Sequence, residues 1–221
     1  MTDMSPTAPV PAEASSAELA TYLAAKLCHD FISPAGAIMS GLDLLNDPAA
    51  QDMRDDALGL ITDSATKLVA LVQFCRVAFG AATTSERFTG EELQGLVDGM
   101  IKGGRATLDW RITETTFDKP AARALVNLAY LTTAALPTGG QAVVASRREG
   151  DRLILTGLAE GARARLKPEA ATGLAGQRLS EGLTGQWIQP YWLWLTVQEA
   201  GGRLAVATEE GRVAIEARMP I

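Results

Sequence analysis

The sequence has only two cysteines and therefore few residues that could crosslink the fold. Its two cysteines, Cys28 and Cys75, stand far apart with no CxxC spacing, which argues against a disulfide framework and a structural zinc site. A reducing compartment fits this cysteine usage best. We also find neither a secretory leader nor an apolar run approaching membrane-spanning length, so the expected location is the cytosol, with no membrane partner.

Basic runs are missing as well. The net charge is -6, and an acidic protein without a basic run repels phosphate backbones, so nucleic acid is not an expected partner. Residues 1–80 carry four basic and ten acidic side chains, whereas residues 81–221 carry sixteen of each. This asymmetry indicates two modules. With 221 residues, 47% of them hydrophobic, the chain can bury a substantial core.

The first module is predicted to be a helical hairpin. Residues 1–16 form a Pro/Ala/Ser-rich stretch that predicts a disordered tail. Apolar positions then step by threes and fours, as in a helix, at Ala20, Ala24, Leu27, Phe31, Pro34, Ile38, Gly41 or Leu42, and Leu45. After a turn at residues 46–48, a heptad stripe follows at Leu58, Ile61, Ala65, Leu68, Val72, Cys75 and Phe79. Two helices joined by a short turn predict an antiparallel hairpin over residues 17–80.

The second helix of this hairpin carries more apolar surface than one partner helix can cover. Leu60, Val69 and Leu71 widen its apolar face beyond the heptad stripe. A hairpin from a second copy would complete a four-helix bundle, so we expect a homodimer.

The pattern changes beyond a short linker, expected at residues 81–88. Helices are predicted at 89–103, 120–135 and 190–200, and strands at 107–113, 141–146, 152–157, 203–208 and 212–217, with the rest as loop. The predicted fold class is therefore α+β: a helical hairpin followed, over residues 89–221, by an α/β sandwich with one mixed sheet.

The chain contains a single histidine, His29, next to Asp30 and five residues before Pro34. A lone helical histidine is usually a satisfied core or capping residue. At about 100° per residue, however, His29 points about 200° away from the apolar stripe, which centres near Leu27. The phase thus predicts an outward-facing imidazole. Pro34 lacks an N–H, so the carbonyl of Asp30 loses its helical partner and a kink beside the histidine is expected.

Residues 29–34, HDFISP, resemble the phospho-acceptor H-box of two-component histidine kinases, H-[DE]-x-x-x-P. Neutral imidazole is a good nitrogen nucleophile near neutral pH, and its phosphoramidate can pass phosphoryl on to an aspartate. The resemblance implies that His29 is the catalytic nucleophile. It also implies that Asp30 orients the ring or accepts its proton, and that Ser33 is a polar neighbour of the reacting group. An ordinary solvated carboxylate remains the alternative for Asp30.

Four residues follow His29 down the same outer side of the helix: Ile32, Gly36, Met39 and Asp43. Apolar residues on an outward face indicate a docking strip for a partner protein. Burial against the second helix is the alternative.

The C-terminal half resembles the ATP-binding domain of the same kinases. The run ARALVNLAYLTTAALPTGGQAVVAS is similar to the N-box helix and following strand, and VQEAGGRLAVAT to the helix–GG–strand end of that fold. In the kinases an N-box asparagine chelates magnesium, but the matching position here is Leu131. An apolar side chain cannot coordinate a cation that requires oxygen ligands.

The remaining nucleotide boxes also depart from the family pattern. Residues 159–163, AEGAR, match D-x-G-x-G with Ala159 in place of the aspartate and Arg163 in place of the second glycine. The glycine-rich phosphate loop corresponds loosely to EGLTGQWIQP, where Trp187 and Pro190 crowd the helix start. We therefore expect no ATP binding.

A phospho-acceptor hairpin joined to an ATP-binding-like domain without its nucleotide site is the pattern of the ChpT-type histidine phosphotransferases. The chain is similar to close members in its CHDFISP and QDMRDDA runs. The resemblance implies a homodimer that accepts phosphoryl from the receiver domain of a hybrid kinase, CckA, and passes it to the response regulators CtrA and CpdR in alphaproteobacterial cell-cycle control.

We expect no cofactor of the protein's own, and Mg²⁺ supplied by the receiver, because no acidic cluster accompanies His29. The densest basic cluster includes Arg163 and Arg165 and could meet a receiver's acidic rim; an ordinary solvated loop is the alternative. Two other functions stay open. One is an ATP-dependent histidine kinase, and the other is a non-enzymatic adaptor of a two-component system.

Overall fold

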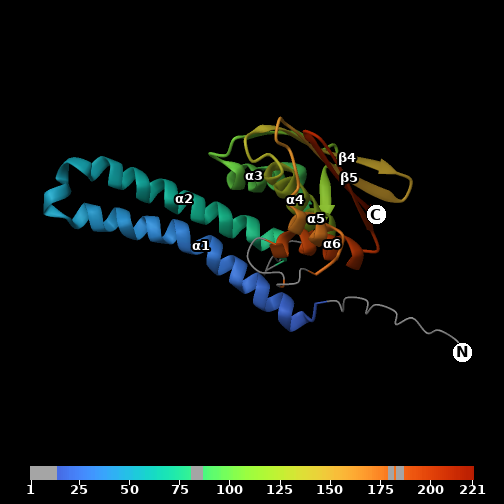
Figure 1. Ribbon diagram of the computed structural model, residues 1–221, viewed down its shortest axis with the longest axis horizontal. Coiled ribbons are helices and arrows are strands. Elements are labelled where there is room, and N and C mark those ends of the chain that lie inside the picture. The colour runs from blue at the N-terminus through green and yellow to red at the C-terminus, as the bar shows by residue number, and fades with distance from the viewer. Residues whose placement is uncertain (1–13, 81–86, 179–181, 183–186) are drawn as a thin grey trace, which may run out of the picture.

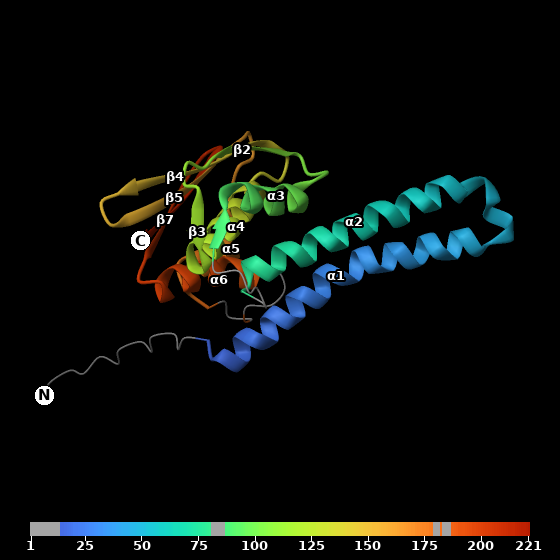
Figure 2. The ribbon, with the colours of Figure 1, turned by 180° about the vertical axis from the view of Figure 1, so that it is seen from behind.

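The computed structural model describes residues 14–80, 87–178, 182 and 187–221. A helical hairpin extends from a compact C-terminal domain (Figure 1). The hairpin consists of α1 (Ser16–Asn46), a 3-10 turn η1 (Pro48–Met53) and α2 (Arg54–Ala78). The two helices run side by side from both viewpoints, and the strands of the domain lie on the side away from the hairpin tip (Figure 2).

Local signals in the sequence fix both ends of α1. Ser15 caps the helix: its hydroxyl accepts from the Glu18 N–H at 3.3 Å, and the Glu18 carboxylate accepts from the Ser15 N–H at 2.9 Å, a capping box. The helix thus begins at Ser16, inside the tail expected over residues 1–16, whose first thirteen residues lie outside the described part. After α1, the Asp47 carboxylate accepts from the Ala49 N–H at 2.9 Å and shapes the turn.

The two helices of the hairpin approach closely near its tip. A Cβ on Gly41 would meet the Ile61 side chain at 2.6 Å, so only glycine allows this spacing. On α2 the inward face comprises Ala57, Ile61, Ser64, Leu68, Leu71, Cys75 and Ala78.

The predicted apolar stripes are partly wrong in phase. Leu58 and Val72 of the expected heptad stripe are exposed, whereas Leu71, expected on the widened outer face, is buried. α2 carries apolar residues on two faces, and only one of these faces packs against α1. The sequence pattern alone does not separate the two. On α1, Ala20 and Ala24 are exposed as well, because the first turns of this helix lean on the C-terminal domain with a different face.

The C-terminal domain is an α+β sandwich, as predicted. Its elements are β1 (Arg87–Thr89), α3 (Gly90–Ile101), β2 (Ala106–Arg111), β3 (Thr116–Asp118), α4 (Lys119–Ala134), β4 (Gly140–Glu149), β5 (Arg152–Glu160), α5 (Pro168–Leu174), α6 (Ile188–Glu199), β6 (Arg203–Glu209) and β7 (Arg212–Pro220). The main sheet has the order β2-β4-β5-β7-β6. The β2–β4 pair is parallel and the other pairs are antiparallel, so the sheet is mixed.

Three short elements were not predicted. β1 and β3 form a separate antiparallel pair in which Phe88 lies opposite Phe117, and α5 falls in a stretch expected to be loop. The linker expected at 81–88 therefore ends too late, since Arg87 and Phe88 belong to β1; its residues 81–86 lie outside the described part.

The C-terminal end of α2 enters the core of the domain. Phe74, Val77 and Ala78 of α2 are buried in one cluster with residues of α4 and the sheet. The carbonyl of Ala78 accepts from the side-chain amide of Asn127 at 2.8 Å and from the indole N–H of Trp192 at 2.9 Å. Two helices of the domain thus hold the last turn of α2, and the two modules share one core.

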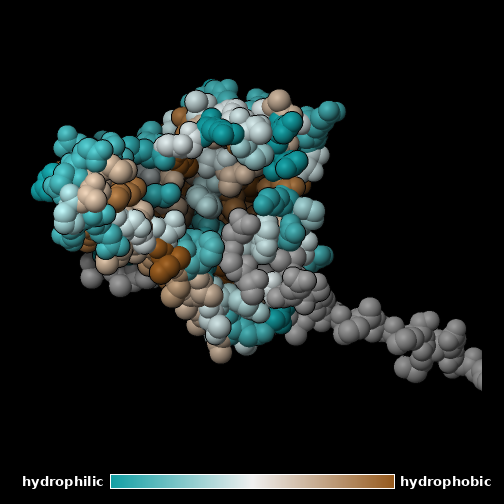
Figure 3. Space-filling model, turned by 60° about the vertical axis from the view of Figure 1, so that its left-hand side comes forward, coloured by the Kyte–Doolittle hydropathy of each residue, from teal (hydrophilic) through white to brown (hydrophobic). Residues whose placement is uncertain are grey.

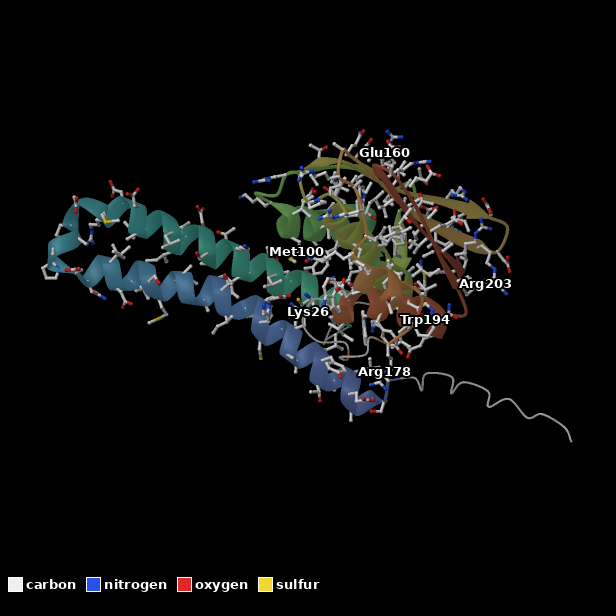
Figure 4. All side chains as sticks on the ribbon, in the orientation of Figure 1. Lys26, Met100, Glu160, Arg178, Trp194 and Arg203 are labelled. Carbon is white, nitrogen blue, oxygen red and sulfur yellow. The ribbon has the colours of Figure 1, made fainter. Side chains whose placement is uncertain are left out.

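The N-terminal turns of α1 make a second junction. Leu19, Tyr22 and Leu23 pack against the buried Ile188 and Tyr191 of α6. Beside this cluster, Arg178 donates to the Glu18 carboxylate at 2.6 Å, close to the start of α1 (Figure 4). The hairpin therefore touches the domain with both helices.

Candidate phosphoryl-acceptor site

His29 lies on the exposed side of α1, in its N-terminal half. Its side chain is 77% exposed, as the helical phase predicts. The ring nitrogen Nδ1 lies 3.2 Å from Oδ1 of Asp30. A carboxylate only accepts hydrogen bonds, so a hydrogen bond at this contact would place a proton on Nδ1. In a neutral ring with that proton on Nδ1, Nε2 keeps its lone pair and can act as a nucleophile.

Asp30 has a second partner that the sequence reasoning missed. The ammonium of Lys26 donates to Oδ2 of Asp30 at 2.7 Å, and the Lys26 side chain is buried. The two residues are four positions apart on the helix, where oppositely charged side chains meet. This spacing was the signal in the sequence that could have revealed the pair.

Two protonated side chains surround this ion pair. Burial raises the pKa of the Cys75 thiol to about 11, with the nearby charges of Lys26 and Asp30 acting in opposite directions. Burial likewise raises the pKa of the Tyr130 hydroxyl above its usual value. Both groups therefore stay neutral near pH 7. Through them, α2 and α4 contribute to the surroundings of the Lys26–Asp30 pair.

Pro34 lies within α1 and is buried. Its missing N–H leaves the Asp30 carbonyl without a helical donor, and Figure 1 shows α1 bent part of the way along its length. The backbone beside the histidine is thus reshaped, in line with the expected kink.

The predicted docking strip is exposed along its full length. Ile32 is 69% exposed, and Gly36, Met39 and Asp43 are exposed as well. Burial of these residues against α2 within one protomer, the alternative considered from the sequence, is therefore wrong. Ser33, next to the strip, is also exposed.

Large apolar side chains also stay exposed on the second helix of the hairpin. They are Leu58, Leu60, Val69 and Val72, and apolar residues interrupt the hydrophilic surface of the hairpin in Figure 3. By length and composition alone, the segment Pro48–Ala78 could cross a membrane. The expectation that no apolar run approaches membrane-spanning length is therefore wrong. A helix of a soluble protein can meet the same two criteria.

The region that matches a nucleotide site is largely filled. Leu131 lines a pocket of only about 100 Å³ together with Leu166, Trp187 and Pro190, whereas small-molecule sites usually measure roughly 300–1,000 Å³. Lys167 covers the Trp187 ring, with its ammonium 5.3 Å from the ring centroid. Ala159 is buried. The side chains of Leu131, Ala159 and Trp187 offer no oxygen ligand for magnesium. Half of the predicted glycine-rich loop, residues 181 and 183–186, lies outside the described part.

Arg163 and Arg165 lie in the loop between β5 and α5, and both are exposed. The Arg165 N–H donates to the carbonyl of Ala135 at 2.9 Å, which ties this loop to the end of α4. Arg165 lines the small pocket together with Tyr130, the residue that also borders the Lys26–Asp30 pair. Within the described ranges, no group of three or more His, Cys, Asp or Glu side chains could hold a metal ion.

Comparisons with known proteins agree with this architecture. Residues 90–212 match the family described as histidine phosphotransferase C-terminal domain. The protein phosphotransferase ChpT of Brucella abortus (strain 2308) is 30% identical over 207 residues, which cover 91% of this chain and 96% of the relative.

One solved structure of a phosphotransferase gives the same result. A bacterial phosphotransferase superposes with a TM-score of 0.83 and 26% identity, covering 95% of this chain and all of that one. The histidine kinase AdeS of Acinetobacter baumannii is a distant match, with a TM-score of 0.47 and 11% identity over 87% of this chain and 97% of its own. From the family match over its C-terminal domain and the ChpT relative along nearly its whole length, the chain belongs to the histidine phosphotransferase family.

Proposed function

We propose that this protein is a phosphorelay intermediate in which His29 carries phosphoryl between the aspartates of receiver domains. The observation that carries the proposal is the exposed His29 ring, with Nδ1 held by Asp30 and Nε2 directed away from that carboxylate. A phosphoryl acceptor that reacts with a protein partner must be accessible to that partner, and the exposed His29 ring meets this condition.

The first transfer follows from this geometry. The Nε2 lone pair attacks the phosphorus of a receiver's phospho-aspartate, the phosphorus–oxygen bond breaks, and the receiver carboxylate leaves with the electron pair. The ring gains positive charge, which the Asp30 carboxylate beside Nδ1 stabilises or removes as a proton. The second transfer is the reverse reaction with another receiver. Ser33 is the exposed polar neighbour of the reacting group.

The receiver is proposed to bring Mg²⁺, and the protein itself needs no cofactor. The exposed strip of Ile32, Gly36, Met39 and Asp43 would contact the receiver along α1, while Arg163 and Arg165 would meet its acidic rim. The protein would act in the cytoplasm as a homodimer, with the exposed apolar face of α2 completing a four-helix bundle. The resemblance of the HDFISP motif and of the two-module layout to ChpT-type phosphotransferases is our reason for proposing CckA as the donor, and CtrA and CpdR as the acceptors, in cell-cycle control.

The decisive experiment is a two-step transfer assay. A receiver labelled with radioactive acetyl phosphate is mixed with the protein and then with a second receiver, in the presence of Mg²⁺. We expect acid-labile, base-stable label on the wild-type protein, followed by base-labile acyl-phosphate label on the second receiver. His29→Gln, which removes the nucleophile from an exposed position without disturbing packing, should take up no label while its thermal stability is unchanged.

Two outcomes would overturn the proposal. Label arriving on His29 from ATP and Mg²⁺ without any receiver would make the protein a histidine kinase, and calorimetric binding of ATP would oppose the filled nucleotide region. Regulation of a partner kinase by His29→Gln at wild-type strength, with no transfer by either protein, would make it an adaptor.

A further inference from the structure

We propose that Lys26 is a positioning residue for phosphoryl transfer: its buried ammonium fixes one oxygen of Asp30 so that the other oxygen holds Nδ1 of His29. This inference rests on the proposed function, because it assumes that His29 is the acceptor. It adds a third member to the site, behind the carboxylate and out of reach of any partner.

Both oxygens of the Asp30 carboxylate are in use. Oδ2 accepts from the Lys26 ammonium at 2.7 Å, and Oδ1 lies 3.2 Å from Nδ1 of His29. An exposed aspartate held at one oxygen can still rotate about its side-chain bonds. Held at both, it keeps one orientation, and through it the imidazole plane is fixed against α1.

The placement of the ammonium is unusual for lysine. Long cationic side chains normally extend their charged end into water, yet the side chain of Lys26 is only 5% exposed, against 23% for Asp30 and 77% for His29. Exposure therefore rises in steps along the series Lys26, Asp30, His29. Figure 4 shows Lys26 on the part of α1 that runs beside the C-terminal domain.

The surroundings give the ammonium no second anion among the described residues. Cys75 of α2 and Tyr130 of α4 lie close enough to feel the charges of Lys26 and Asp30, and burial, which raises the pKa of both, keeps them neutral. A buried ammonium needs a partner, and the recorded partner is Asp30. The charge of Lys26 is thus directed at the carboxylate that touches the acceptor ring.

This arrangement has a chemical consequence for His29. A free imidazole in water favours the tautomer with its proton on Nε2, which has no lone pair to attack with at that atom. An immobilised carboxylate at Nδ1 favours the other tautomer. In this proposal Lys26 acts only by holding Asp30.

Lys26→Met tests the proposal, with Lys67→Met as the matched control. Methionine preserves the length and apolar stem of lysine, and replacing a buried charge by an apolar side chain of similar volume is often tolerated. Lys67 is an exposed lysine of α2, so its change removes the same charge from the hairpin without touching Asp30.

The first measurement is the tautomer of His29 by nitrogen NMR on histidine-labelled protein. The chain has one histidine, so the spectrum contains a single ring without overlap. We expect the Nδ1–H form to dominate in wild type and in Lys67→Met, and the Nε2–H form to gain population in Lys26→Met. This readout needs no partner and no activity.

The second measurement is the single-turnover rate of phosphoryl transfer from a saturating labelled receiver. Lys26→Met should be slower by about 10-fold to 100-fold, while Lys67→Met keeps the wild-type rate. In the background of Asp30→Asn the lysine change should add almost nothing, because a residue that acts through Asp30 loses its effect when the carboxylate is gone.

The outcomes separate the two proposals. If wild type takes no label, the proposed function fails, while the NMR comparison still tests Lys26. If wild type relays phosphoryl but Lys26→Met matches it in tautomer and rate, or if the lysine and aspartate effects multiply independently, Lys26 does not position Asp30. Should Lys26→Met fail to fold by circular dichroism, Lys26→Gln takes its place with the same expectations.

Discussion

The hairpin and the C-terminal domain differ in how many large apolar side chains they leave exposed. Among the described residues, eight of the ten exposed large hydrophobic side chains belong to the hairpin and its turn, and only Val206 and Ile221 belong to the domain. In the domain, α4 alone buries eleven side chains against the sheet and its neighbours. One module is complete in a single copy, while the other leaves apolar surface for a partner.

The same contrast applies to chemistry. The hairpin keeps the His29 side chain at the surface with the Lys26–Asp30 ion pair beneath it, whereas the region of the domain that matches a nucleotide site is lined by side chains such as Leu131 and Trp187. The packing that stabilises such a scaffold does not depend on a ligand.

The largest expected effect concerns the open face of α2. Val69 is 55% exposed on this face, and Val69→Asp would place a charge in the proposed dimer core. We expect the dissociation constant of the dimer to rise at least about 100-fold, since an unpaired carboxylate buried in an apolar interface costs several kcal/mol. Analytical ultracentrifugation over a concentration series measures it.

The matched control is Val206→Asp, on the edge strand β6 of the domain. It should leave the oligomeric state unchanged. Equal effects of the two variants would erase the contrast between an open hairpin and a closed domain.

The next effect tests whether the domain contributes to partner docking. Arg163→Glu combined with Arg165→Glu should raise the KM for a phosphorylated receiver by about 10-fold at low salt with little change in kcat, because rim charges govern encounter more than chemistry. The difference should shrink as ionic strength rises. A control pair, Arg148→Glu with Arg203→Glu, changes the same charge elsewhere on the exposed domain surface; if it gives the same rise, the effect is one of net charge alone.

A smaller effect tests the shared core. Trp192→Phe keeps an aromatic ring but removes the N–H that donates to the Ala78 carbonyl, which still has Asn127 as a donor. The free energy of unfolding should fall by about 1 kcal/mol, in one cooperative urea transition. Trp110→Phe on β2 makes the same ring change without a recorded hydrogen bond and should cost less. Two separate transitions for hairpin and domain would show that their cores are independent.

The smallest effect lies at the start of α1. Hydrogen bonds from Ser15 and Arg178 lower the pKa of Glu18 below its usual value. The Glu18 contacts are therefore present above the ordinary carboxyl pKa and are lost as pH falls through the lowered one. Glu18→Gln keeps the cap but weakens the Arg178 pair, so we expect slightly faster amide exchange in the first turn of α1 near neutral pH, and a difference from wild type that disappears in acid. Unchanged exchange in this turn would mean that the pair does not anchor α1.

Periodicity and turn residues were enough to predict the long elements. The apolar spacing predicts α1 and α2, and the alternating runs around Gly150 and Gly201–Gly202 predict β4 to β7. The three-residue strands β1 and β3 carry too few side chains for a period to show. The helix α5 is short as well, although Pro168 and Glu169 at its start are helix-initiating residues that could have indicated it.

Only the part of the phosphoryl-acceptor site that depends on local sequence could be predicted. The position of His29 follows from a motif and a helical phase, both of which are local. Lys26 is buried, and its charge acts on Tyr130, more than a hundred residues later in the chain. Sequence spacing does not describe such a junction between modules. Likewise, Leu71 was assigned to an outer face because the contact of α2 with α4 is a tertiary one.

The anchoring of the last turn of α2 by Asn127 and Trp192 has a consequence for the direction of the proposed phosphoryl transfer. The side-chain amide of Asn127 and the indole of Trp192 both donate to the Ala78 carbonyl, so the hairpin is fastened to the domain at this point. If the protein relays phosphoryl as proposed and this attachment keeps the two modules from moving apart, the direction of transfer would depend on how much of each receiver arrives phosphorylated.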